Sequence, residues 1–201
     1  MTVWTISAQE GTGGAAVAAG LAERAGVPLV DRAALELLAR DLHPDVPDLD
    51  HIEERVGGRF DAFALSLALT GGAAAAFREL QLRETLPHLA REVAAAVARS
   101  PCVVFASGAF AAMRDCTGAV HARLWAPFPW RVERYAAERV VARREAEAAV
   151  KHDDHVKRSW VHALFRLDLD DARCYTVVVD ASRLSRDAIV ELLAAAGSCR
   201  A

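Results

Sequence analysis

The start of the chain combines a short apolar strand, a glycine-rich turn and a helix, and no other feature limits the fold as strongly. Residues 3–7 favour a strand, and apolar side chains at helical spacing over residues 15–25 predict a helix that ends at Gly26. A turn between them directs backbone N–H groups and the positive end of the helix dipole toward one point, which suits an anion, and glycine lets the backbone approach closely. The candidate phosphate-binding residues are Gly11, Thr12, Gly13 and Gly14. The same connector also occurs in α/β proteins that bind nothing there, so both interpretations stay open.

Strands and helices continue to alternate after this opening. Further apolar runs predict strands at about residues 28–31, 102–106, 120–126 and 175–179, and helical patterns cover residues 33–40, 108–114 and 185–196. This alternation predicts a single α/β domain over residues 1–201, with a five-stranded parallel sheet flanked by helices. We expect two helical insertions on this core. They lie at about residues 45–99 and at about residues 129–166, the second made of helices over residues 129–145 and 147–165.

The overall composition excludes several classes of protein. Apolar residues make up 53% of the chain and the net charge is −3, so the chain is too apolar to be disordered. The near-neutral charge argues against a nucleic-acid binder, and no uncharged apolar run is long enough to span a membrane. The first residues lack the basic segment of an export signal, and the four cysteines form no C-x-x-C pair. We therefore expect free thiols and a cytoplasmic location.

A group of histidines and aspartates at residues 152–155, followed by His162, raises the question of a metal site. Histidines three residues apart can share one face of a helix and so hold a metal ion together. A solvated polar face explains the same pattern and is the favoured interpretation. No metal ligand is therefore assigned.

Longer segments, taken in order, resemble the cytidylate kinase-like family, a branch of the P-loop nucleoside monophosphate kinases. The family start is similar to ISREYGSGGREIAxxLAxxLGxPxxDKE, and residues 6–18 (ISAQEGTGGAAVA) and 26–32 (GVPLVDR) follow it. The family pattern cVIvGRGA resembles residues 102–109 (CVVFASGA). The later patterns, an "aP" strand end, an RxxR helix, DxxRxxY and YDLVxNTsrL, are matched by Ala126-Pro127, Arg131 with Arg134, Asp154 with Lys157 and Trp160, and residues 175–184. The ordered series covers most of the chain.

This resemblance implies a P-loop NTPase fold with an NMP-binding-like insertion and a lid. It implies an enzyme that transfers the γ-phosphoryl group of ATP to a nucleoside monophosphate, with CMP favoured and Mg²⁺ as a cofactor. Such catalysis consists of positioning and charge stabilisation, and therefore needs cations. Several are missing here, because Gly14 stands at the usual lysine position and Ala16 at the usual hydroxyl position. The family arginines are replaced by Ala8, Ala15 and Ser107.

The remaining cations lie in the lid-like helices. By resemblance, the candidate catalytic residues are Arg131, Arg134 and Arg139, and the candidate nucleotide-binding residues are Asp31, Arg143, Asp154, Lys157 and Asp180. Arg139 and Arg143 are four residues apart, so on one helix they could converge on phosphates, which arginine binds bidentately. The two aspartates Asp31 and Asp180 end strands, where open sheets bind ligands. The alternatives are surface ion pairs for the arginines and helix capping for Asp31, with Asp180 equally open.

Three functional hypotheses follow. The first is a nucleoside monophosphate kinase, whose activity the missing cations weaken or abolish. The second is a non-catalytic protein that binds a nucleotide or another anion and acts through a protein partner. The third is an all-helical transcription regulator, which the opening strand and glycine turn disfavour.

Overall fold

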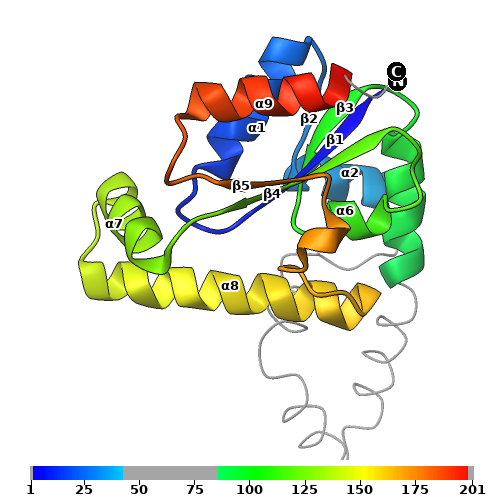
Figure 1. The fold of residues 1–201 in the computed structure, drawn as a ribbon. Coiled ribbons are helices and arrows are strands. Elements are labelled where there is room, and N and C mark those ends of the chain that lie inside the picture. The colour runs from blue at the N-terminus through cyan, green and yellow to red at the C-terminus, as the bar shows by residue number, and fades with distance from the viewer. Residues whose placement is uncertain (1, 43–85, 199–201) are drawn as a thin grey trace, which may run out of the picture.

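The computed structural model describes residues 2–42 and 86–198, and the described chain alternates strands and helices as expected (Figure 1). The strands are β1 (Val3–Ala8), β2 (Leu29–Val30), β3 (Cys102–Phe105), β4 (Ala119–Trp125) and β5 (Val177–Asp180). The α-helices are α1 (Gly14–Ala25), α2 (Arg32–Leu42), a helix over residues 86–97, α6 (Ala109–Ala112), α7 (Phe128–Arg139), α8 (Arg143–Phe165) and α9 (Arg186–Ser198). A short 3-10 helix spans Ala172–Cys174.

The five strands form one sheet in the order β2-β3-β1-β4-β5, and all neighbouring pairs are parallel. The expected five-stranded parallel sheet is therefore confirmed, and an all-helical protein is excluded. Because parallel strands end at one edge, the glycine turn after β1 lies beside the ends of β3 and β4. This is the edge at which open α/β sheets bind ligands.

Helices cover both faces of the sheet. In Figure 1, α1 and α9 lie on one face, whereas α6 and α8 lie on the other. The first face holds the main core, in which Val17 and Leu21 of α1 and Leu193 of α9 are fully buried against β1 and β4. On the opposite face, Phe110 of α6 and Val161 of α8 are buried together. The sheet is thus enclosed, as continuous apolar strands require.

Two helices lie in the segment predicted to be lid-like, but the boundary between them differs from the prediction. Instead of helices over residues 129–145 and 147–165, α7 ends at Arg139 and α8 begins at Arg143. Val140 takes a left-handed conformation with φ of 55° and caps α7. The turn lets Val132 of α7 pack against Ala146 and Val150 of α8. Tertiary packing, and not a helix-breaking residue, decides this boundary.

The remaining expectations are met in part. Most of the insertion predicted at residues 45–99 lies outside the described residues, but the helix over residues 86–97 packs Leu89 and Val93 against Leu164 of α8. Ser185 caps α9, with its Oγ accepting a hydrogen bond from the Ala188 N–H at 3.2 Å. Within the described ranges, every helix is too short or too polar to cross a bilayer.

Candidate functional site

The glycine turn is held in a fixed shape against the end of β4. Gly11 and Gly13 have φ of 82° and 76°, and Gly13 is the left-handed N-cap of α1. The Thr12 hydroxyl donates to the Gln9 carbonyl at 2.6 Å, and Gln9 N–H donates to the Leu124 carbonyl at 3.0 Å. None of the described side chains caps α1. Its first N–H groups therefore point outward at the turn, where an anion would be stabilised.

Helix α7 lies directly against this turn. A Cβ atom added to Gly11 would meet the backbone carbonyl of Arg131, and one added to Gly13 would meet the guanidinium of Arg134. Arg134 also pairs with Glu138 at 2.7 Å and stacks over the Trp130 ring at 5.4 Å. The structure thus brings a partly exposed guanidinium onto the phosphate-binding candidates.

Arg131 is placed differently, because it is buried and almost fully hydrogen-bonded. Its side chain is 4% exposed and makes two bonds to the carboxylate of Asp154, at 3.0 and 2.8 Å. It also donates to the carbonyls of Ala126 at 3.0 Å and Glu10 at 3.2 Å. Arg131 and Asp154 are therefore brought together as a clamp that joins α7, α8 and the turn. A phosphate cannot share their donors and acceptors without breaking that clamp.

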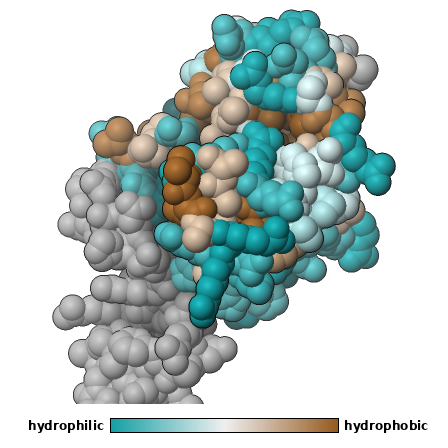
Figure 2. Space-filling model, turned by 90° about the vertical axis from the view of Figure 1, so that its left-hand side faces the viewer, coloured by the Kyte–Doolittle hydropathy of each residue, from teal (hydrophilic) through white to brown (hydrophobic). Residues whose placement is uncertain are grey.

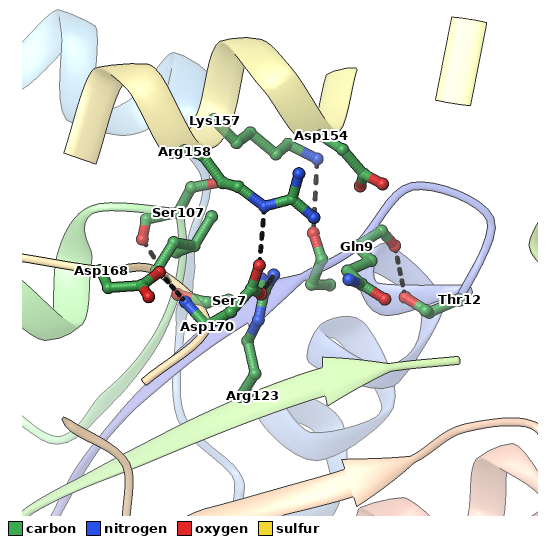
Figure 3. A network of polar contacts seen from close by, with 12 residues as sticks. Ser7, Gln9, Thr12, Ser107, Arg123, Asp154, Lys157, Arg158, Asp168 and Asp170 are labelled. Carbon is green, nitrogen blue, oxygen red and sulfur yellow. Dashed lines mark hydrogen bonds and ion pairs between the residues drawn. The ribbon is translucent and has the colours of Figure 1, made fainter. Parts of the chain in front are cut away.

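Lys157 of α8 reaches the turn from above (Figure 3). Its ammonium donates to the Ala8 carbonyl at 3.3 Å and lies 3.7 Å from a carboxylate oxygen of Glu10. It also pairs with Asp153 at 2.7 Å, and its side chain is 22% exposed. Lys157 thus stands where the turn begins.

Two further arginines, expected to share one helix, lie on separate helices. Arg139 ends α7 and lies over the Tyr135 ring at 5.9 Å, whereas Arg143 begins α8 and pairs with Glu133 and Glu147, both at 3.3 Å. The prediction assumed one continuous helix with i, i+4 spacing. Because the chain turns at Val140, that spacing does not apply, and Arg143 forms surface ion pairs.

Figure 2 shows the side that carries α7, where hydrophobic residues lie among hydrophilic ones.

The two strand-end aspartates serve their local backbone. Asp31 accepts a hydrogen bond from the Ala34 N–H at 3.0 Å and so caps α2. Asp180 accepts from the Ser182 hydroxyl at 2.6 Å and from Arg183 at 3.2 Å. The bond from Ser182, with help from Arg183, lowers the pKa of the Asp180 carboxyl. Both aspartates lie at the expected sheet edge, engaged in turns.

The usual lysine position of the turn is physically filled. A Cβ atom added to Gly14 would overlap the Cβ of Ala8 and press on the ring of Phe105. Ala15 and Ala16 are exposed and carry no polar group. Ala8 of β1 and Phe105 of β3 therefore leave no space for a side chain at position 14.

Sequence reasoning missed a buried arginine on β4. Arg123 is 4% exposed and donates to Asp170 at 2.6 Å, and Asp170 also accepts from Arg158 of α8 at 2.7 Å. Burial alone would raise the pKa of Asp170, but the bonds from the two arginines lower it. The one sequence feature that could have indicated this group is a lone arginine inside an apolar strand. Its partner lies in a loop 47 residues further on, where no sequence pattern marks it.

An apolar cavity of about 140 Å³ lies at the end of β3. Its walls come from α2, the helix over residues 86–97, α6 and α8, and Trp160 and Phe165 provide aromatic surface. Ser107 opens onto the cavity, and its carbonyl accepts a hydrogen bond from the Ser7 hydroxyl at 3.0 Å. The cavity is thereby joined to the strand that leads into the glycine turn.

Among the described residues, no group of three His, Cys, Asp or Glu side chains is placed to hold a metal ion.

Comparisons with known proteins agree with this geometry. The cytidylate kinase-like family matches residues 3–183. The chain belongs to that family. No curated protein matches it.

Solved structures extend the comparison to the fold of this cytidylate kinase-like chain. An uncharacterized protein from Eubacterium ventriosum ATCC 27560 is similar over 99% of both chains, with 18% identity and a TM-score of 0.68. A gluconokinase from Sinorhizobium meliloti 1021 is similar over 98% of this chain and 92% of its own, with 15% identity and a TM-score of 0.55. At these identities the likeness concerns the fold alone.

Proposed function

We propose that the chain is an ATP-dependent kinase that transfers a phosphoryl group to a nucleoside monophosphate, with CMP favoured as the acceptor. The observation that carries the proposal is the position of Arg134 and Lys157 at a glycine turn whose own lysine is absent. Both cations come from the lid-like helices, so the turn supplies backbone donors while α7 and α8 supply charge. This division fits the electrostatic demands of phosphoryl transfer.

The residues present fit the phosphates of ATP. The N–H groups at the start of α1 have no side-chain cap, and Gly13 allows the Arg134 guanidinium to lie against the turn. The apolar cavity beside Ser107 would receive the body of the acceptor. In this arrangement, the transferred group would pass between the turn and the end of β3, beneath Lys157.

The site offers fewer protein ligands for Mg²⁺ than it offers hydrogen-bond donors for the phosphates. Bound Mg²⁺ would neutralise charge on the phosphate oxygens, and it needs only one or two carboxylates besides them. Asp154 is occupied on both oxygens by Arg131, so the available carboxylates are Glu10 and Asp153, which both contact Lys157. We therefore expect protein carboxylates to contribute little to the binding of Mg²⁺.

A second candidate is a non-catalytic nucleotide- or anion-binding protein that acts through a protein partner. It is favoured by the filled lysine position at Gly14 and by the clamp between Arg131 and Asp154. Backbone donors bind phosphate without these groups, whereas a well-placed cation on the transferred group is worth about 10³–10⁵ in rate.

A nucleotide panel measured on one sample separates the two candidates. Thermal stabilisation by ATP and CMP, together with ADP formation that depends on added CMP, is the expected result. Stabilisation without turnover for every monophosphate would support the non-catalytic protein. A melting temperature that no nucleotide changes, with no turnover, would contradict both.

A further inference from the structure

The buried guanidinium of Arg123 is only partly satisfied by the protein. Its Nη2 donates to Asp170 at 2.6 Å, but Nε and Nη1 are buried without a hydrogen-bond partner in the described part of the chain. An arginine carries five N–H donors, and three of them are on these two nitrogens. Leaving buried donors unpaired is costly, and native proteins rarely do so without a reason.

The position of Arg123 places those donors beside the candidate site. Arg123 pairs in register with Ser7, the penultimate residue of β1 before the glycine turn. Figure 3 shows its side chain extending from β4 toward α8, with Asp170 between it and Arg158. The donors therefore lie under the same helix that carries Lys157.

Asp170 is shared between the guanidinium groups of Arg123 and Arg158, so it does not neutralise both of them. The carboxylate of Asp168 lies in the same loop, accepts a hydrogen bond from the Asp170 N–H and interacts with Arg158. Tyr175 does not compensate, because burial raises the pKa of its hydroxyl and keeps it neutral. Its hydroxyl donates instead to the Leu169 carbonyl at 2.7 Å. The donors that an anionic group could use in this cluster are therefore Nε and Nη1 of Arg123.

Asp170 and Arg158 are more exposed than Arg123. Their side chains are 36% and 50% exposed, whereas that of Arg123 is 5% exposed. Asp170 lies in the loop between α8 and the 3-10 helix, and its carboxylate has the planar two-oxygen shape that an arginine fork binds. An incoming oxyanion can replace Asp170 on Arg123, while Asp170 keeps its bond to Arg158.

We propose that Arg123 binds an oxyanion of the acceptor substrate, a phosphate or a carboxylate, through Nε and Nη1, and that Asp170 occupies Nη2 of the same guanidinium until the acceptor arrives. The assignment to the acceptor rests on the proposed kinase function, whereas the oxyanion site itself does not. Arg123 is then the contact residue, and Asp170 is a competing internal anion.

The test is a titration with inorganic phosphate and with acetate, with chloride at matched ionic strength as the control. Binding is measured by calorimetry and by thermal unfolding. The wild type should bind phosphate or acetate. Arg123→Met should bind that anion at least about tenfold more weakly, because bonds to a charged group are lost. Asp170→Ala should bind it more tightly than the wild type, because the competing carboxylate is gone.

These opposite directions distinguish a ligand site from a structural ion pair. A structural pair predicts that both variants lose stability and that neither changes anion affinity, which would overturn the proposal. Should Arg123→Met fail to fold, Arg123→Lys keeps the charge without the fork, and Asp170→Ala still gives an independent result. Anion binding that is equal in all variants, or absent in the wild type, also overturns the proposal. CMP-dependent ADP formation in the wild type is read separately, so failure of the kinase function remains distinguishable.

Discussion

Gly14 offers a sharp prediction, because helix propensity and packing oppose each other there. Gly14 begins α1 with a φ that alanine can adopt, so Gly14→Ala in an ordinary helix would stabilise by up to about 1 kcal/mol. Here the added Cβ would overlap the Cβ of Ala8 and lie 3.1 Å from the Phe105 ring. Overpacking of this kind costs about 1–3 kcal/mol. We expect a net loss of about 1–2 kcal/mol.

Urea denaturation followed by circular dichroism measures this loss. With an m-value of about 2 kcal/mol/M, the midpoint should fall by about 0.5–1 M. Ala8→Gly removes the obstructing methyl group, so the double variant should recover more stability than the sum of the single changes allows. Gly20→Ala on the same helix is the control, since its Cβ would meet only one methyl group of Val190, at 3.2 Å, and should lose less. A Gly14→Ala protein as stable as the wild type would refute the reasoning that packing excludes a lysine from this turn.

Three further predictions concern the surroundings of the turn. Asp154→Ala leaves Arg131 buried without its carboxylate and should cost about 3–5 kcal/mol in urea denaturation, and an unchanged midpoint would show that the clamp is unimportant. Val140→Gly should raise the melting temperature by about 2–4 °C, because Val140 is 91% exposed in a left-handed conformation that disfavours β-branched residues; a lower melting temperature would contradict this. The lowered pKa of Asp170 means that its contribution to stability is present above its unfolded pKa of about 4 and is lost as the pH falls through the folded pKa. The stability difference between wild type and Asp170→Asn should therefore shrink in acid denaturation profiles below about pH 4, and a difference independent of pH would exclude this linkage.

The sequence was sufficient to predict the sheet and the turn, because both follow from local patterns. Apolar runs separated by helical spacing define the strands, and glycines at 11 and 13 correspond to positive φ values in the structure. The break after Arg139 could not be predicted, since Val140 and Val141 are not helix breakers and the turn depends on packing between α7 and α8. The pairing of Arg139 with Arg143 on one face was wrong for the same reason.

Residues of the site could be predicted only where a pattern within one segment of the sequence points to them. Lys157 could be named as a nucleotide-binding candidate by resemblance, whereas its contacts with Ala8 and Glu10 depend on how α8 crosses the sheet edge. The cluster of Arg123 with Asp170 joins residues far apart in the chain, and no local pattern links them. Long-range ion pairs of this kind become visible only in the folded arrangement.

The central claim is that the lid-like helices supply the cation that the glycine turn lacks, and the two lysines of the chain allow a direct test. Both lie on α8: Lys157 contacts the turn, whereas Lys151 is exposed over the Phe128 ring at 5.4 Å. The measurement is the dissociation constant for ATP, by calorimetry, of Lys157→Met against Lys151→Met. A charge-assisted contact to phosphate is worth about 1.5–3 kcal/mol, so Lys157→Met should weaken binding about 10- to 100-fold while Lys151→Met stays within about twofold of the wild type. Equal affinity of the two variants would contradict the account.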